Sequence, residues 1–243
     1  MGDNRKHRGQ HPADSKLFDE KTVPIIRRAV VDMEWLLSHG YPERASLKLV
    51  GDRFRLQDRQ RKAIFRTACS NQDLELRTKH QVHAEQVTGQ TILLDGFNVL
   101  ITVESALSDG FLFESRDGCY RDLASIHGSY KRVTETQEAI LLIGEYLQEI
   151  GVQKATWYFD RPISNSGRLK TMLYQIADEK EWNWKIDLVY NPDKVLIAAD
   201  EIVVSSDSII LNESKQWFNL AREVVDSYVS KARIIRLSKK KHL

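Results

Sequence analysis

The sequence is poor in the features that mark exported, membrane-spanning or disulfide-stabilised proteins. Its 243 residues include only two cysteines, Cys69 and Cys119, which have neither a CxxC nor a zinc-ligand spacing. No segment approaches the roughly 18 consecutive apolar residues that a membrane-spanning helix needs. The first sixteen residues are polar and lack the apolar core of a secretion signal. We therefore expect a cytoplasmic protein without a membrane partner, whose cysteines are ordinary thiols.

The composition is that of a globular protein, but its charge is unevenly distributed. Hydrophobic residues make up 42% of the chain and charged residues 29%. Residues 1–90 contain 17 Lys and Arg against 12 Asp and Glu, whereas the remainder contains 19 against 22. This asymmetry suits a basic first part that attracts an anionic polymer and an acidic second part that gathers metal ions.

The N-terminal part changes from polar sequence to helical periodicity and back. We expect a disordered tail over residues 1–18, a basic helical module over 19–72 and a linker rich in Gln and His over 73–90. Within the module, apolar residues three and four positions apart, with turn residues such as Gly40 and Pro42 between the runs, predict three helices. These helices cover residues 21–39, 43–50 and 56–69.

From Thr91 onward the periodicity changes to short apolar runs that alternate with helical segments. Strands are predicted over residues 91–94, 155–159, 184–190, 201–205 and 233–237, and helices over residues 134–150, 167–180 and 212–229. The less regular stretch 107–133 is interpreted as a hairpin or an inserted loop. Continuous apolar strands separated by helices indicate a buried parallel sheet with helices on both faces. The sequence therefore predicts a three-layer, Rossmann-like α/β domain over residues 91–243.

Aspartates follow four of the predicted strands. Asp95 ends the strand in ILLDGFN, Asp160 ends TWYFD, Asp193 follows the third strand in VYNPDK, and Asp207 follows the fourth in VVSSD. Because ligands of open α/β sheets bind beyond the carboxyl ends of the strands, we expect these carboxylates to meet at one edge.

Four neighbouring carboxylates repel one another unless cations neutralise them. Mg²⁺ or Mn²⁺, which prefer oxygen ligands, are the natural partners. A single aspartate at a strand end is more often a cap or turn residue, but four in succession favour a shared metal site. Asp200 is an alternative to Asp193, and Glu138 is another possible ligand from a helix.

Several of these motifs together resemble those of the PIN/NYN-like nuclease superfamily. The shared motifs are DGFN after an apolar strand, YFD at a later strand end and VVSSDSIIL before a helix. With HGYPERA and RPISNSGR, the whole chain is similar to an uncharacterised prokaryotic domain-of-unknown-function family within that superfamily. The resemblance covers residues 91–237 and implies metal-dependent RNA hydrolysis. It assigns the catalytic and metal-binding roles to Asp95, Asp160, Asp193 and Asp207.

The RPISNSGR segment and its surroundings supply candidate substrate contacts. Ser164, Asn165 and Ser166 can cap the following helix, whose free N–H groups with Arg168 form an anion site. Simple helix capping is the alternative interpretation. Three further candidates for contact with the substrate are Asn98, Arg161 and His127.

A basic run from Arg44 to Arg66 holds eight Lys and Arg and two Asp. Such a surface can follow a phosphate backbone, although a solvated helix face or one that docks on the acidic domain fits the pattern as well. The candidate RNA-binding residues are Arg53, Arg55, Arg59, Arg61, Lys62 and Arg66.

The leading functional hypothesis is a Mg²⁺- or Mn²⁺-dependent endoribonuclease acting on single-stranded or structured RNA. For the oligomeric state, a homodimer is one hypothesis. The alternative is a PIN-like module that binds RNA or a protein without cutting. Arg161-Pro162 and the spacing of only thirteen residues between Asp193 and Asp207 motivate it. A third hypothesis is phosphate-ester chemistry on a small nucleotide. The absence of a DxD pair after the first strand disfavours a haloacid-dehalogenase-type phosphatase.

Overall fold

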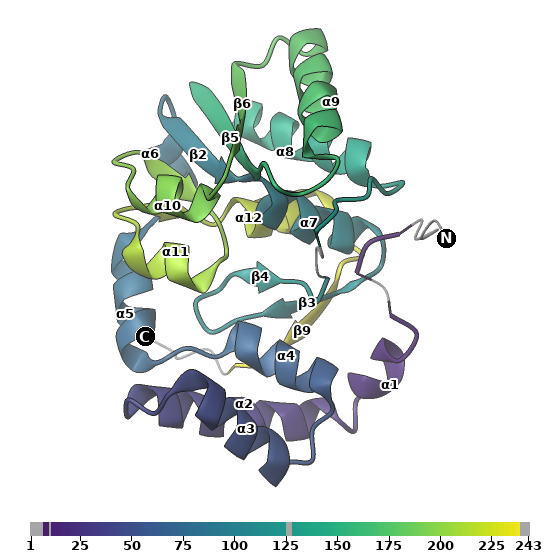
Figure 1. Cartoon of the computed structure of the whole chain (residues 1–243), viewed down its shortest axis with the longest axis vertical. Coiled ribbons are helices and arrows are strands. Elements are labelled where there is room, and N and C mark those ends of the chain that lie inside the picture. The colour runs from purple at the N-terminus through teal and green to yellow at the C-terminus, as the bar shows by residue number, and fades with distance from the viewer. Residues whose placement is uncertain (1–6, 10, 125–127, 239–243) are drawn as a thin grey trace.

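The structure, a computed structural model, describes residues 7–9, 11–124 and 128–238. A helical module forms one end of the molecule, and a large sheet with its helices forms the other (Figure 1). A small second sheet lies between them, in contact with a helix from each part. None of the helices in these described ranges is both long and apolar enough to cross a bilayer.

Five helices form the N-terminal module. They are α1 (Asp14–Leu17), α2 (Val23–Ser38), α3 (Glu43–Arg53), α4 (Asp58–Thr67) and α5 (Asn71–His80). Helix α2 buries one apolar face at helical spacing, with Ile26, Val30 and Met33 fully inaccessible. Gln57 and Gln60 form a capping box that fixes the beginning of α4. The predicted helical module is therefore present, with two helices more than the sequence indicated, α1 and α5.

The main sheet contains six strands, all parallel: β1 (Gln81–Val82), β2 (Thr91–Asp95), β5 (Lys154–Asp160), β6 (Trp184–Val189), β7 (Ile202–Val204) and β8 (Trp217–Phe218). Their order is β1-β8-β7-β2-β5-β6. Strands β5 and β6 extend the sheet to one side of β2, while β7 and β8 extend it to the other. The order therefore reverses between β2 and β7, the position at which open α/β sheets bind their ligands.

Helices cover both faces of this sheet, which confirms the predicted three-layer α/β fold. Alternate residues of β2 face opposite layers, so that Ile92 and Leu94 pack in the largest core and Leu93 packs in a smaller one. The larger core includes α7 (Gly96–Leu107), α8 (Thr136–Glu149), α9 (Ser166–Glu179) and α12 (Leu220–Tyr228). The smaller core includes α10 (Pro192–Ile197) and α11 (Ser208–Glu213).

The second sheet joins the two parts of the molecule. Strands β3 (Phe111–Glu114) and β4 (Tyr120–Arg121) form an antiparallel hairpin within the stretch predicted to hold one, and β9 (Arg233–Arg236) pairs parallel to β3. Phe113 packs into the core of the helical module, whereas its neighbour Leu112 packs into the α/β core. The last predicted strand is therefore present, but it belongs to this connecting sheet and not to the main one.

Two segments expected to lack structure are ordered. In the predicted tail, Asp14 in α1 is 4% exposed and pairs with Arg59, and Arg8 donates to Glu104 at 2.7 Å. The expectation of disorder is therefore wrong for residues 11–18. The predicted linker contains the rest of α5, the edge strand β1 and α6 (Ala84–Val87). These pieces are ordered because Ser70 caps α5 and Val82 and Val87 are buried.

The predicted helix over residues 212–229 is interrupted by a strand. Helix α11 ends at Glu213, β8 then extends the main sheet beside β7, and α12 begins at Leu220. The fully buried Trp217 explains the break, because β8 directs its ring inward and its indole N–H donates to the Arg77 carbonyl at 2.8 Å.

Candidate active site

The four predicted aspartates all follow strands of the main sheet at its carboxyl edge. Asp95 is the last residue of β2 and Asp160 the last of β5. Asp193 lies in the first turn of α10, directly after β6, and Asp207 is the N-cap of α11, directly after β7. Asp95 and Asp207 thus flank the point where the strand order reverses.

A serine links these two aspartates. The buried Ser205 donates its hydroxyl proton to Asp95 Oδ2 at 2.8 Å, and its oxygen accepts the Asp207 backbone N–H at 3.0 Å. Gly96 permits close packing of the segment after Asp95 on Phe159, since a Cβ there would lie 2.4 Å from the Phe159 ring. The end of β2 and the start of α11 are therefore fastened together at the carboxylates.

A second bond joins the same two segments. Asn98 Oδ1 accepts both the backbone N–H and the hydroxyl of Ser206, each at 2.8 Å. Asp207 in turn accepts the backbone N–H groups of Ile209 at 2.8 Å and Ile210 at 3.4 Å. Asp207 is therefore a helix cap, as the simpler interpretation of a strand-end aspartate suggested, and a member of the acidic edge as well.

The carboxylates act on one another electrostatically. Burial, followed by repulsion from Asp207 and Asp193, raises the pKa of Asp95 from 3.8 to about 7. The pKa of Asp193 is raised by burial and, to a smaller extent, by repulsion from Asp207. The pKa of Asp160 is raised by burial and, to a smaller extent, by repulsion from Asp193. Asp207 thus repels Asp95 and Asp193, and Asp193 repels Asp95 and Asp160, which is the condition that a cation relieves.

The donor chemistry suits a hard cation, but the carboxylates do not form a closed cage. Every candidate ligand at this edge is an oxygen, as Mg²⁺ and Mn²⁺ prefer. Across the described ranges, no three or more His, Cys, Asp or Glu side chains are arranged to hold a metal ion. Mg²⁺ commonly takes one or two carboxylates and fills its other positions with water and substrate phosphate. The edge fits that open mode of binding.

A cleft of about 680 Å³ separates the acidic edge from the helical module. Asp160, Asp207 and Asn98 line one side, and Glu43 and Phe65 line the other. Phe65 is 40% exposed in this cleft, and Ile209 beside Asp207 is 62% exposed. A ligand in this cleft would therefore lie beside Asp160 and Asp207 and contact apolar surface from both parts of the chain.

The RPISNSGR segment occupies a different place. Asn165 adopts a left-handed conformation with φ 71° and donates its side-chain N–H to the Tyr130 carbonyl at 2.9 Å. Ser166 is buried at the beginning of α9, and the backbone of Ser164 bridges to Ser129. These contacts lie within the protein and fix the conformation of the loop. They do not involve a substrate.

A second, basic pocket lies beside this loop. Arg168 and Asn165 line a cavity of about 450 Å³ together with Lys131 and Arg132. Arg161 is exposed, and its guanidinium carbon lies 5.2 Å from the centre of the Tyr190 ring. Of the predicted substrate contacts, Asn98 lines the acidic cleft, and Asn165 and Arg168 line this pocket. The residues that line neither are Arg161, Ser164 and Ser166, and His127 lies outside the described residues.

Most of the basic residues proposed to bind RNA contact the protein itself. Arg59 pairs with Asp14, Arg61 with Asp52 at 2.9 Å and Arg53 with Asp32 at 3.0 Å. Lys62 donates to the Leu123 carbonyl at 3.1 Å and Arg66 to the Ala124 carbonyl at 3.2 Å, which docks α4 on the segment after β4. Arg55 is exposed. RNA contact by this set stays a prediction, and docking accounts for Lys62 and Arg66.

The alternative ligands lie away from the acidic cleft. Asp200 precedes β7, at the opposite end of that strand from Asp207, and its exposed carboxylate pairs with Lys215. Glu138 is exposed on the first turn of α8. Asp193 is therefore the better candidate, because its repulsion raises the pKa of both Asp95 and Asp160.

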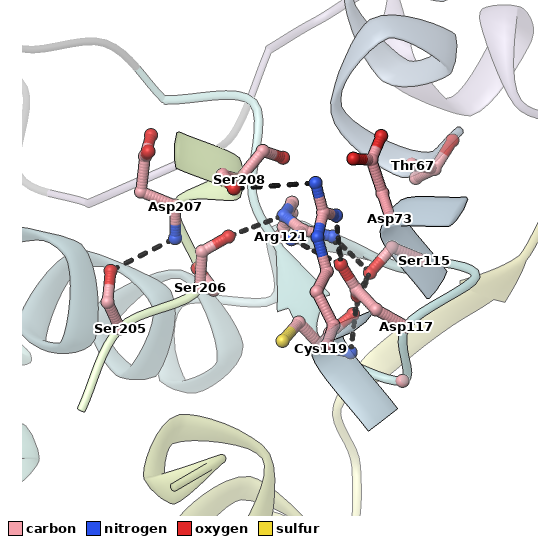
Figure 2. A network of polar contacts seen from close by, with 12 residues as sticks. Thr67, Asp73, Ser115, Asp117, Cys119, Arg121, Ser205, Ser206, Asp207 and Ser208 are labelled. Carbon is pink, nitrogen blue, oxygen red and sulfur yellow. Dashed lines mark hydrogen bonds and ion pairs between the residues drawn. The ribbon is translucent and has the colours of Figure 1, made fainter. Parts of the chain in front are cut away.

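Sequence reasoning overlooked a buried charged network beside the edge. Asp117, in the turn between β3 and β4, pairs with Arg77 and Arg121, and Arg121 donates to the Ser206 carbonyl at 2.7 Å (Figure 2). The RDG turn and the two serines of VVSSD were visible in the sequence, but no local pattern joins them. Arg121 and Ser206, which form the bond between these two parts, lie more than eighty residues apart in the sequence.

Comparison with known proteins assigns the chain to a family. The family model described as "Domain of unknown function (DUF5616)" matches residues 84–223, which is more than half of the chain. The chain belongs to this family. A second model, "Protein of unknown function (DUF434)", matches residues 25–80, so that the two matches meet at β1, where the module gives way to the main sheet.

One relative is similar along nearly its whole length. "Uncharacterized protein MJ0935" of Methanocaldococcus jannaschii is 29% identical over 203 residues, which cover 83% of this chain and 97% of the relative. No solved structure matches the chain.

Proposed function

We propose that the protein is a Mg²⁺- or Mn²⁺-dependent ribonuclease of the PIN/NYN-like kind. The observation that carries the proposal is the pair Asp95 and Asp207, linked through Ser205 at the reversal point of the sheet, where burial and then repulsion from Asp207 and Asp193 raise the pKa of Asp95. Partly buried carboxylates that repel one another cost stability, so a function that needs the charge is the favoured explanation.

The residues divide the task between holding the cation and holding the substrate. Asp95 and Asp207 would hold the ion, with Asp193 and Asp160 as further ligands around it. When bound, the ion supplies Lewis-acid activation of water and neutralises charge on a phosphodiester. Ser205 keeps Asp95 oriented, and Asn98 keeps the Ser206 segment against it. The cleft between Phe65 and Ile209 gives a single strand of RNA room to enter beside Asp160.

The second candidate is a module that binds RNA without cutting it. Two observations favour it: no three acidic side chains are arranged to hold an ion within the described parts of the chain, and Asp207 is already engaged as a helix cap. Such a protein would bind RNA with strong salt dependence and without any need for metal.

One experiment separates the two. Fluorescently labelled single-stranded RNA of mixed sequence is incubated with the full chain in Mn²⁺ and, in parallel, in EDTA. We expect cleavage in Mn²⁺ only, reduced by about 100-fold or more in Asp95→Asn, while Asp200→Asn, at the opposite end of the sheet, cleaves normally. RNA that binds equally in EDTA and Mn²⁺ and is never cut would establish the binding module instead.

A further inference from the structure

We propose that Arg121, Asp117 and Arg77 form a positioning network that holds the segment Ser206–Ser208, and with it Asp207, at the acidic edge. The inference rests on the proposed function, because it assigns these residues to that same site. It also means that the helical module contributes a residue to the site, since Arg77 belongs to α5. None of the three is a predicted metal ligand; they act through the backbone that carries one.

Two arginines grip the segment on either side of Asp207. Arg121 Nε donates to the Ser206 carbonyl at 2.7 Å, and Arg77 Nη2 donates to the Ser208 carbonyl at 3.4 Å. Figure 2 shows Arg121 between Asp117 and this segment. Because the two held carbonyls belong to the residues immediately before and after Asp207, the direction of the Asp207 carboxylate depends on both contacts.

Asp117 fixes the two arginines relative to each other. Its Oδ2 accepts from Arg77 Nη1 at 2.7 Å and from Arg121 Nη2 at 2.8 Å, and its Oδ1 accepts from Arg121 Nη1 at 2.9 Å. Ser115 Oγ and the Cys119 backbone N–H complete the shell of this carboxylate at 2.6 and 3.1 Å. The planar guanidinium group of Arg121 meets the carboxylate through two parallel bonds, and this fork geometry restricts rotation as the single bond from Arg77 does not.

Burial separates this network from the many ion pairs on the surface. The side chains of Arg77, Arg121 and Asp117 are 3%, 7% and 1% exposed. Buried ion pairs contribute little net stability compared with well-packed apolar residues, and their best-attested use is to specify one arrangement. Here the arrangement that they specify joins α5, the β3–β4 turn and α11, the last through Arg77 Nε donating to Asn212 Oδ1 at 2.7 Å.

Arg116 provides a matched control in the same turn. It also joins the turn to the helical module, donating to the Cys69 carbonyl at 2.9 Å and to Asn71 Oδ1 at 2.6 Å, and its side chain is 10% exposed. Its contacts end in the module and do not reach the segment that holds Asp207. Arg116→Ala therefore removes a comparable bridge and leaves the grip on Ser206–Ser208 intact.

The test compares Arg121→Ala with Arg116→Ala in the full chain by hydrogen exchange, Mn²⁺ titration and RNA cleavage kinetics. In Arg121→Ala we expect at least about tenfold faster exchange at the Ile209 and Ile210 amides, which Asp207 caps. We also expect about 10- to 100-fold weaker Mn²⁺ affinity, as is typical when a ligand loses its support, and a lower kcat with little change in KM. Methylguanidinium added to Arg121→Ala restores part of the loss, and Arg116→Ala shows none of these changes.

The outcomes remain distinct from those of the proposed function. Equal exchange at Ile209 and Ile210 in wild type and Arg121→Ala overturns the positioning role, and so does an equal increase in the two variants. Should the wild type bind no Mn²⁺ and cut no RNA, the proposed function fails, but the exchange comparison still decides the positioning role. If Arg121→Ala does not fold, Arg121→Lys replaces it, because lysine keeps the charge and loses the fork, and the same exchange criterion applies.

Discussion

Replacing Asp95 with asparagine should abolish metal-dependent activity and at the same time stabilise the metal-free protein. Burial and repulsion by Asp207 and Asp193 raise the pKa of the folded Asp95 carboxyl from 3.8 to about 7. A group whose pKa is raised by folding favours the folded state fully below its unfolded pKa. That contribution is lost as the pH rises through the folded pKa. Metal-free wild type should therefore lose stability between about pH 4 and pH 7.

The size of the loss follows from the shift. About three pKa units, at 1.36 kcal/mol each, give roughly 4 kcal/mol as an upper bound at pH 8. Asparagine carries no charge at any of these pH values, and its side-chain oxygen can still accept the Ser205 hydroxyl. The variant should therefore match wild type near pH 4 and exceed its stability by up to about 4 kcal/mol at pH 8.

Urea unfolding of both proteins in EDTA, from pH 4.5 to pH 8, measures this difference. Asp200→Asn is the matched control, because Asp200 is exposed and pairs with Lys215 away from the acidic edge. Saturating Mn²⁺ at pH 8 should then stabilise wild type by about 2.7 kcal/mol at 100 times its Kd and leave Asp95→Asn unchanged. A stability difference between wild type and Asp95→Asn that does not vary with pH would refute the assignment of Asp95 as a strained, charge-bearing ligand.

Two further outcomes are expected. Phe65→Ala should slow cleavage of single-stranded RNA by about tenfold and leave hydrolysis of a small phosphodiester such as bis(p-nitrophenyl) phosphate unchanged, because aromatic stacking contributes about 1–3 kcal/mol per base and a small ester does not reach Phe65. Equal slowing of both substrates would contradict this role. Asp117→Asn should destabilise the protein by about 3–5 kcal/mol in urea unfolding at pH 7, because it leaves Arg77 and Arg121 buried without their carboxylate. Since Arg121 and Arg77 lower the pKa of Asp117 below 3.8, the contribution of that carboxylate is present above pH 3.8 and is lost in acid, so the two proteins should converge in stability below that pH.

Local patterns in the sequence predicted four of the six strands of the main sheet, β2, β5, β6 and β7. The runs ILLD, TWYFD and IVV are apolar without alternation, which is typical of a strand buried on both faces. The same logic failed for β8, because Trp217 and Phe218 form too short a run to interrupt a helical pattern. It also placed β9 in the main sheet, since nothing local in RIIR indicates which neighbour it pairs with.

The site was predictable to the extent that it follows from topology. Parallel strands end at one edge, so aspartates after those strands had to lie there, and the structure brings Asp95 and Asp207 into hydrogen-bond contact through Ser205. The other wall of the cleft was not predictable, because Phe65 and Glu43 reach it only through the docking of α3 and α4. That docking depends on Lys62 and Arg66, whose charges in the sequence suggested a surface for RNA.

Charged residues of the helical module therefore form contacts with other parts of the protein itself. Lys62 and Arg66 hold α4 against the segment after β4, and Arg77 reaches through α5 to the backbone on one side of Asp207. The two family matches divide the chain between residues 80 and 84, yet Arg77 and Asp117 pair across that division with 2.7 Å between Nη1 and Oδ2. An α/β domain without the module would still contain Asp95 and Asp207. It would lack Arg77, so that the buried Asp117 would pair with Arg121 alone. The helical module thus lines one side of the cleft and, through Arg77, holds the backbone beside Asp207. It is not a separate basic arm.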